Sequence, residues 1–213
     1  MRLGKAAPEH VRRYWEALGR FIDAFAAVET HMQITLWHYA DVTVGTARAI
    51  FSGVRTDTAA SLIRRLMEVN DPGDEARKEL TYLFKRLDLI NTIRNDIVHY
   101  GARFSGGEAI VSTALKAHTQ QRVRETTVSP EILDDLTYDL RKIVAHLSIH
   151  RARHKMPDRI LAPEFLAVLR APWRYRPVER YPPAHRGSDP RPATLPGRRP
   201  KHRDRPRSSP GKS

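Results

Sequence analysis

The sequence has no cysteine among its 213 residues. This absence excludes disulfide scaffolds, thiolate zinc sites, iron–sulfur clusters and cysteine nucleophiles. Long apolar runs are also missing, because no uncharged stretch approaches the roughly 20 residues that a membrane-spanning helix needs. The N-terminus has no apolar segment typical of a signal peptide. We therefore expect a soluble, cytoplasmic protein without a membrane partner.

Proline and excess positive charge are scarce in the first part of the chain and concentrated in the last. Residues 1–150 contain 20 basic and 19 acidic residues, whereas residues 151–213 contain 17 basic and 5 acidic residues and 12 of the 15 prolines. A segment that is so basic and so rich in proline cannot bury enough apolar area to fold. We predict a helical domain over residues 1–155 and a disordered basic tail over residues 156–213. Within that tail, only the amphipathic run at 163–170 is expected to dock on the helices.

Apolar residues recur at helical spacing through most of the first part. The periodicity predicts helices over about 8–40, 43–51, 56–69 and 74–98, and a last helix that starts at 129–131. Glycines then punctuate short apolar runs, which predicts a β-hairpin turning at Ser105, Gly106 and Gly107. The expected fold class is all-α: an antiparallel bundle of four to five helices with a small β-hairpin insertion.

Each of the two long helices carries one charge in its apolar face. Arg94 projects from the middle of the stripe of the second long helix, and Glu29 from the middle of the stripe of the first. An unpaired buried charge costs several kcal/mol, so we predict that Glu29 and Arg94 pair across the helix interface. The alternatives are that either side chain reaches the domain edge, or that the pair only sets helix register.

Arg94 also opens a motif at the end of its helix, where Asn95 follows it and His99 comes five positions later, before Gly101. Helix geometry separates Arg94 from His99 by about 140° and ~7.5 Å along the axis. A site that uses both side chains is therefore more natural between two copies of the chain. Here the sequence resembles the HEPN superfamily of all-helical domains, in its RiboL-PSP-HEPN or Abi-like form. The signature of that superfamily is Arg, a polar residue and then His.

The resemblance covers roughly residues 8–150 and implies an endoribonuclease without metal or other cofactor, acting as a homodimer. Arg94 would hold the scissile phosphate, Asn95 would hydrogen-bond near it, and His99 would move protons. The products would end in 2′,3′-cyclic phosphates. The resemblance also implies a toxin or defence protein, with an antitoxin or another regulatory protein as partner.

A non-catalytic module is the alternative interpretation of the same residues. Arg94 would then be a structural ion-pair partner, and His99 would cap a helix C-terminus. Such a HEPN-like domain would bind RNA or a protein partner through its basic tail.

Aromatic and arginine residues alternate early in the tail, at Trp173, Arg174, Tyr175 and Arg176. This pattern fits stacking on unpaired bases combined with phosphate contacts. Further on, Arg198 and Arg199 add to a sequence-independent, salt-dependent affinity for RNA. The alternative is an unconstrained extension of an arginine-rich chain, because arginine outnumbers lysine 29 to 8 throughout.

Three histidines, His146, His150 and His154, are spaced four residues apart and would share one helical face. Such spacing can hold a metal, but no glutamate lies between the first two as in a zinc protease helix. We predict a polar helix surface here and no metal site.

Overall fold

A computed structural model describes residues 7–114, 123, 125–152 and 163–177. The chain divides into one unit over residues 1–177 and another over 178–213, and the second lies outside the described residues. The segment 163–177 therefore groups with the helical unit, whereas the boundary predicted from the sequence lies after residue 155. None of the described helices is both long and apolar enough to cross a lipid bilayer.

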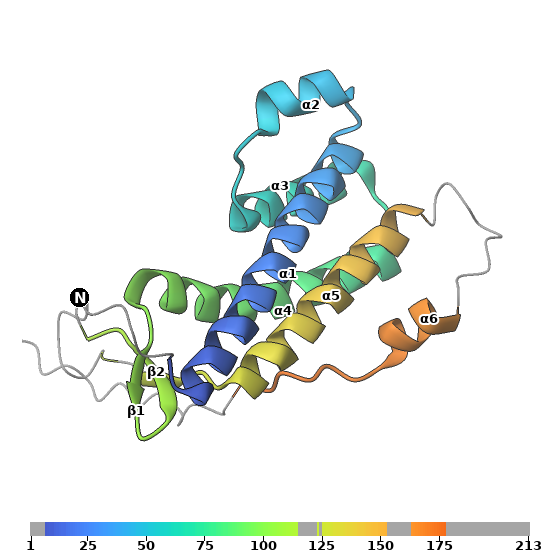
Figure 1. Ribbon diagram of the computed structural model, residues 1–213. Coiled ribbons are helices and arrows are strands. Elements are labelled where there is room, and N and C mark those ends of the chain that lie inside the picture. Colours follow the sequence, from blue (N-terminus) through green and yellow to red (C-terminus); the bar gives the residue numbers. More distant parts are fainter. Residues whose placement is uncertain (1–6, 115–122, 124, 153–162, 178–213) are drawn as a thin grey trace, which may run out of the picture. The chain divides into compact units, whose positions relative to one another are not determined.

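The described residues are mostly helical, with one small sheet (Figure 1). In chain order the elements are α1 (Glu9–Ala40), α2 (Val44–Phe51), α3 (Thr56–Asn70), α4 (Asp74–Tyr100), β1 (Arg103–Ser105), β2 (Glu108–Ser112), β3 (Glu125–Thr127), α5 (Pro130–Ala152) and α6 (Pro163–Arg170). All the predicted helices are present within two residues of their expected starts.

Local chemistry explains several of the helix boundaries. The Thr43 hydroxyl accepts a hydrogen bond from the backbone N–H of Thr46 and caps α2. The Ser129 hydroxyl does the same for Ile132 at the start of α5. Such caps satisfy N–H groups that the first helical turn leaves unpaired. At the other end of α4, Gly101 adopts φ 66° and ψ 177°, a conformation essentially restricted to glycine.

The predicted hairpin is confirmed and is part of a three-stranded antiparallel sheet in the order β1-β2-β3. Gly106 and Gly107 both have positive φ, as a tight hairpin turn requires. The third strand was not predicted, because Glu125–Thr127 is short and has no apolar alternation.

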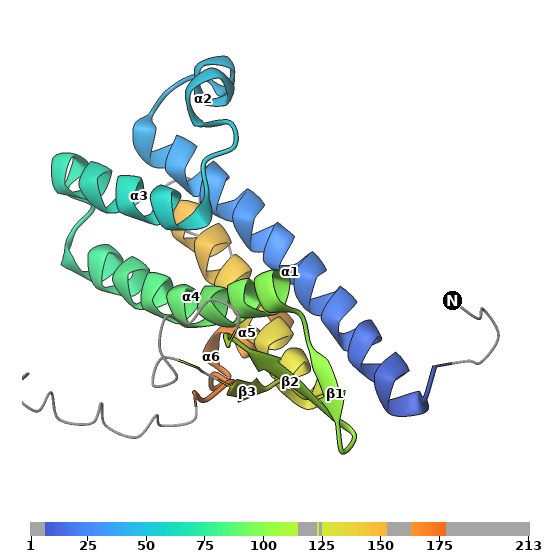
Figure 2. The same ribbon diagram turned by 90° about the vertical axis from the view of Figure 1, so that its left-hand side faces the viewer.

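Helices α1 and α5 lie side by side and run in the same direction (Figures 1 and 2). Arg20 pairs with Asp134 near their N-terminal ends, and Tyr39 bonds to His150 near their C-terminal ends. Between α4 and α5, Glu79 near the start of α4 lies beside His150 near the end of α5. Buried apolar side chains of α1, α3, α4 and α5 form one continuous core.

Candidate functional site

Arg94 is half-buried and has no carboxylate partner among the described residues. Its Nη1 donates a hydrogen bond of 3.0 Å to Oδ1 of its neighbour Asn95. Its guanidinium carbon lies 5.2 Å from the ring centre of Phe25 on α1, a cation–π contact. The Nε atom is buried and makes no hydrogen bond in the described part of the chain. Among the described residues, only the neutral groups of Asn95 and Phe25 contact this charge.

The ion pair expected between Glu29 and Arg94 is absent from the salt bridges formed by the described residues. Glu29 is partly exposed, so solvent can hydrate its carboxylate. Both residues have core neighbours on their own helices, Val28 and Met32 on α1 and Ile93 and Ile97 on α4, yet each of the two charged side chains is only partly buried. An amphipathic pattern indicates which face a residue occupies, but not which side chain of the facing helix it meets.

His99 is exposed in the last turn of α4, one turn beyond Asn95. The contact of Arg94 with Phe25 brings this end of α4 against the middle of α1. Large apolar side chains are exposed on both elements: Trp15 and Ile22 on α1, and Val98 on α4. A cation with no counter-ion in the described part of the chain and a solvent-accessible imidazole therefore lie near exposed apolar side chains.

Trp173, predicted to stack on RNA bases, is already packed between protein groups. Its ring stacks on His146 at 6.1 Å and meets Tyr82 edge-on at 6.0 Å between centroids. The Arg86 guanidinium and the Lys142 ammonium lie 5.0 and 4.7 Å from its ring centre. The sequence pattern of alternating aromatic and basic residues missed this, because the partners are separated from Trp173 by at least 27 positions.

Buried charges on α4 and α5 hold the backbone around Trp173, and we call residues 171–176 the docked segment. The carboxylate of Asp139, completely buried, accepts hydrogen bonds from the backbone N–H groups of Arg174 (2.9 Å) and Tyr175 (3.1 Å). Arg86 bridges the same carboxylate, at 2.9 Å, to the carbonyl oxygen of Tyr175, at 2.8 Å. Lys142 donates to the carbonyl oxygen of Ala171.

The remaining predicted RNA-binding residues have different surroundings. Arg174 is exposed, and its guanidinium lies 3.8 Å from the ring centre of Tyr138. Arg176 is exposed at the end of the docked segment. Arg198 and Arg199 lie outside the described residues.

The histidines with helical spacing belong to a buried polar cluster on α1, α4 and α5. Glu79 approaches Nδ1 of His146 at 3.2 Å and Nδ1 of His150 at 3.7 Å. The Tyr39 hydroxyl lies 2.6 Å from Nε2 of His150, and burial together with the charge of Glu79 raises the pKa of Tyr39 to about 12. His154 lies outside the described residues, and the part described contains no group of three or more ligands arranged to hold a metal ion.

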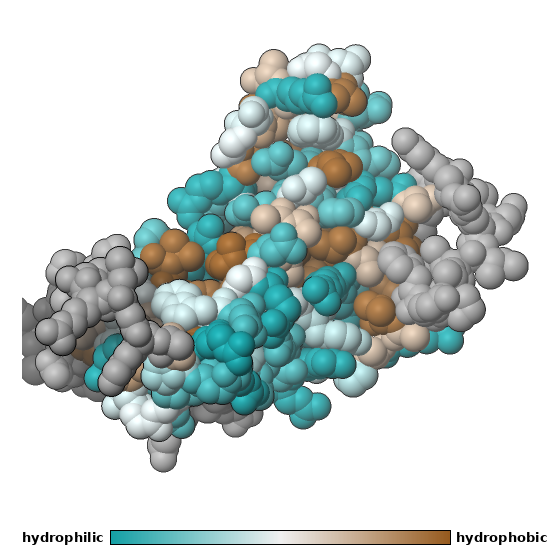
Figure 3. All heavy atoms as spheres, viewed as in Figure 1, coloured by the Kyte–Doolittle hydropathy of each residue, from teal (hydrophilic) through white to brown (hydrophobic). Residues whose placement is uncertain are grey.

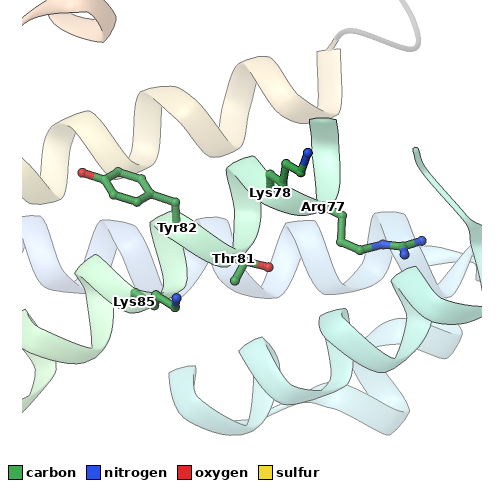
Figure 4. A pocket seen from close by; sticks show the side chains of 5 residues that line it. All are labelled: Arg77, Lys78, Thr81, Tyr82 and Lys85. Atoms are coloured by element: carbon green, nitrogen blue, oxygen red, sulfur yellow. The ribbon is translucent and has the colours of Figure 1, made fainter. Parts of the chain in front are cut away.

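A shallow cationic pocket of about 370 Å³ lies along the outer side of α4 (Figure 4). Its lining is Arg77, Lys78, Thr81, Tyr82 and Lys85. Arg77 pairs with Asp71 at 2.8 Å, whereas neither Lys78 nor Lys85 forms a salt bridge with any described residue. Two free ammonium groups and a hydroxyl at such spacing can contact phosphate groups of a polyanion.

Comparisons of this chain with protein-family models, with curated proteins and with solved structures find no match.

Proposed function

We propose that this protein is a metal-independent endoribonuclease of the HEPN type, whose site is formed by Arg94, Asn95 and His99 from two copies of the chain. A helical bundle would be its scaffold, as in that superfamily. The observation that carries the proposal is the environment of Arg94. An arginine kept for structure is normally paired with a carboxylate, whereas this one is oriented by an amide and an aromatic ring. Its unneutralised charge is available to a phosphate.

The reaction needs only groups that these residues supply. The neutral imidazole of one His99 takes the proton from a ribose 2′-OH, and the 2′-oxygen attacks the adjacent phosphorus. The bond from phosphorus to the 5′-oxygen breaks, and the imidazolium of His99 of the partner subunit gives its proton to that leaving oxygen. The products are a 2′,3′-cyclic phosphate and a 5′-hydroxyl. Arg94 offsets the negative charge that grows on the phosphate oxygens.

Two copies are needed because His99 and Arg94 point away from one helix at different angles, and because one histidine cannot be acid and base in the same step. The exposed side chains of Trp15, Ile22 and Val98 supply apolar surface for such a contact. A toxin or defence role, with an antitoxin or other regulatory partner, is part of the same proposal.

Cleavage of RNA in the presence of EDTA tests the chemistry. We expect wild-type protein to cut and His99→Ala to bind RNA without cutting it. The matched control is His10→Ala, because His10 is also an exposed helical histidine. Arg94→Lys should lower the rate by about 10²-fold or more, since an ammonium cannot replace the guanidinium fork. RNA that remains intact with wild-type protein, or equal cutting by His99→Ala, rejects the enzyme in favour of the non-catalytic module.

The attraction for RNA is assigned to residues beyond Pro177, which contain 10 basic and 3 acidic residues. Truncation after Pro177 keeps the docked segment, whereas truncation after residue 155 would remove it together with the tail. We expect the shorter chain to bind RNA more weakly and with a smaller dependence on salt concentration. An unchanged affinity and salt slope would contradict a tethering role for the tail.

A further inference from the structure

A cavity of about 600 Å³ lies where the C-terminal ends of α1 and α5 meet the start of α2. Its size is in the range of small-molecule sites. Figure 3 shows apolar side chains, in brown, around α2 and the C-terminal end of α1 on the face that it views. The cavity lining includes neither Arg94 nor His99, and Arg94 contacts α1 at Phe25, nine positions before Ile34, the first α1 residue of the lining.

The polar residues of the lining are His38, Asp41, Ser148 and Arg151, and Arg151 is half-buried and hydrogen-bonded to neutral acceptors. Its Nη1 donates to the carbonyl oxygen of His31 at 3.2 Å and to the hydroxyl of Thr35 at 2.7 Å. Its Nη2 lies 3.0 Å from Nδ1 of His31. A guanidinium can only donate, so this Nδ1 must be the acceptor, and His31 carries its proton on Nε2.

No carboxylate of the described residues lies within 4.0 Å of the Arg151 guanidinium. Burial accordingly lowers the pKa of Arg151, with no acidic neighbour to oppose it. Five donor hydrogens are available on a guanidinium and the bonds to His31 and Thr35 use three of them. The cavity therefore has a rigidly held positive charge with hydrogen-bonding capacity left over.

Three aliphatic residues also line the cavity: Ile34, Val42 and Val44 are 38%, 37% and 56% exposed. Trp37 also lines it, and its indole N–H is buried without a hydrogen-bond partner in the described part of the chain. Exposed aliphatic groups around one unpaired cation suit a ligand that has an apolar body and an anionic head.

We propose that this cavity binds an amphipathic carboxylate, with the carboxylate on Arg151 and the aliphatic body against Ile34, Val42 and Val44. The site is independent of the proposed nuclease chemistry. Asp41 also lines the cavity and is the one acidic residue of the lining. Its carboxylate would attract a ligand with a cationic head group instead of an anionic one. A comparison of ligands that differ only in the head group distinguishes these charges.

The test uses the indole signals of the three tryptophans in the full-length, ¹⁵N-labelled protein. Octanoate should shift the indole resonance of Trp37 in a saturable way and leave those of Trp15 and Trp173 in place. Octanol and acetate, which each lack one half of the ligand, should bind at least about 10-fold more weakly. Binding of octanol or octylamine as tight as that of octanoate would overturn the proposal, as would the absence of a Trp37 shift.

Two surface variants test whether an added carboxylate weakens octanoate binding only when it lies at the cavity. Val44→Glu puts a carboxylate at the cavity and should weaken octanoate binding by about 10-fold or more. It is compatible with folding, since an acidic residue is favourable in the first turn of α2. The matched control is Val69→Glu, because Val69 on α3 is 80% exposed and does not line the cavity. Equal effects of the two substitutions would refute the location.

Discussion

Replacement of Trp173 by alanine should destabilise the helical domain, although this residue lies in a part of the sequence that resembles a disordered tail. The Trp173 side chain is partly buried. Burial of roughly 100 Å² of apolar surface contributes about 2.5 kcal/mol. The cation–π contacts with Arg86 and Lys142, at 5.0 and 4.7 Å, add about 0.5–1 kcal/mol each.

Part of this gain is offset by the entropy cost of ordering the docked segment, so we expect a net loss of about 3 kcal/mol. The loss has an upper limit, because once the segment has detached no further contact can be lost. For a domain of this size the change corresponds to a decrease in Tm of roughly 6–12 °C. Thermal and urea unfolding followed by circular dichroism measure it.

The matched control is Trp15→Ala, because Trp15 is 54% exposed and makes one described ring contact, with Tyr14. Its substitution should cost less than about 1 kcal/mol. If Trp173→Ala unfolds at the same temperature and urea concentration as wild type, then the docked segment contributes nothing to stability. The assignment of residues 163–177 to the domain would then be wrong in energetic terms.

Two further predictions concern backbone conformation and pH. Gly101→Ala should destabilise the protein by about 1–3 kcal/mol, because Gly101 has φ 66°. Gly19→Ala, in the exposed face of α1, should instead stabilise it by about 0.5–1 kcal/mol, and equal unfolding midpoints for both variants would contradict this prediction. Burial, and secondly the charge of Arg151, lowers the pKa of His31, so the unfolded chain binds this proton more readily and stability should be lost as the pH falls below about 6.5. His31→Gln should reduce that loss in Tm measured from about pH 7.5 to 5.5, and parallel curves for variant and wild type would rule out His31 as the cause.

The docked segment also changes how experiments on the tail must be designed. A chain cut after residue 155 would lose Trp173 and the two backbone N–H groups that satisfy the buried carboxylate of Asp139. An uncompensated buried carboxylate is strongly destabilising. Weak RNA binding by that shorter chain would then report partial unfolding as well as loss of charge. Truncation after Pro177 removes the basic tail alone.

The buried cluster of Tyr39, Glu79 and His150 illustrates what spacing can and cannot predict. The interval between His146 and His150 correctly places both on one side of α5, and both meet Glu79 there. Nothing in the spacing indicates that the third partner is a glutamate about 70 residues earlier. The cluster gives buried polar atoms most of their hydrogen-bond partners, which any such group requires.

The helices and the β1–β2 hairpin followed from the sequence by itself, because helix periodicity, the cap at Ser129 and the glycines after α4 act over a few residues. The sequence also placed Arg94 on an apolar face and His99 at a helix end. Whether Arg94 meets Glu29, and whether Trp173 is free to bind a base, depends on residues far apart in the chain. Packing against Phe25, Arg86 and Lys142 decided both, since the energy of a charge or ring depends on what surrounds it in three dimensions.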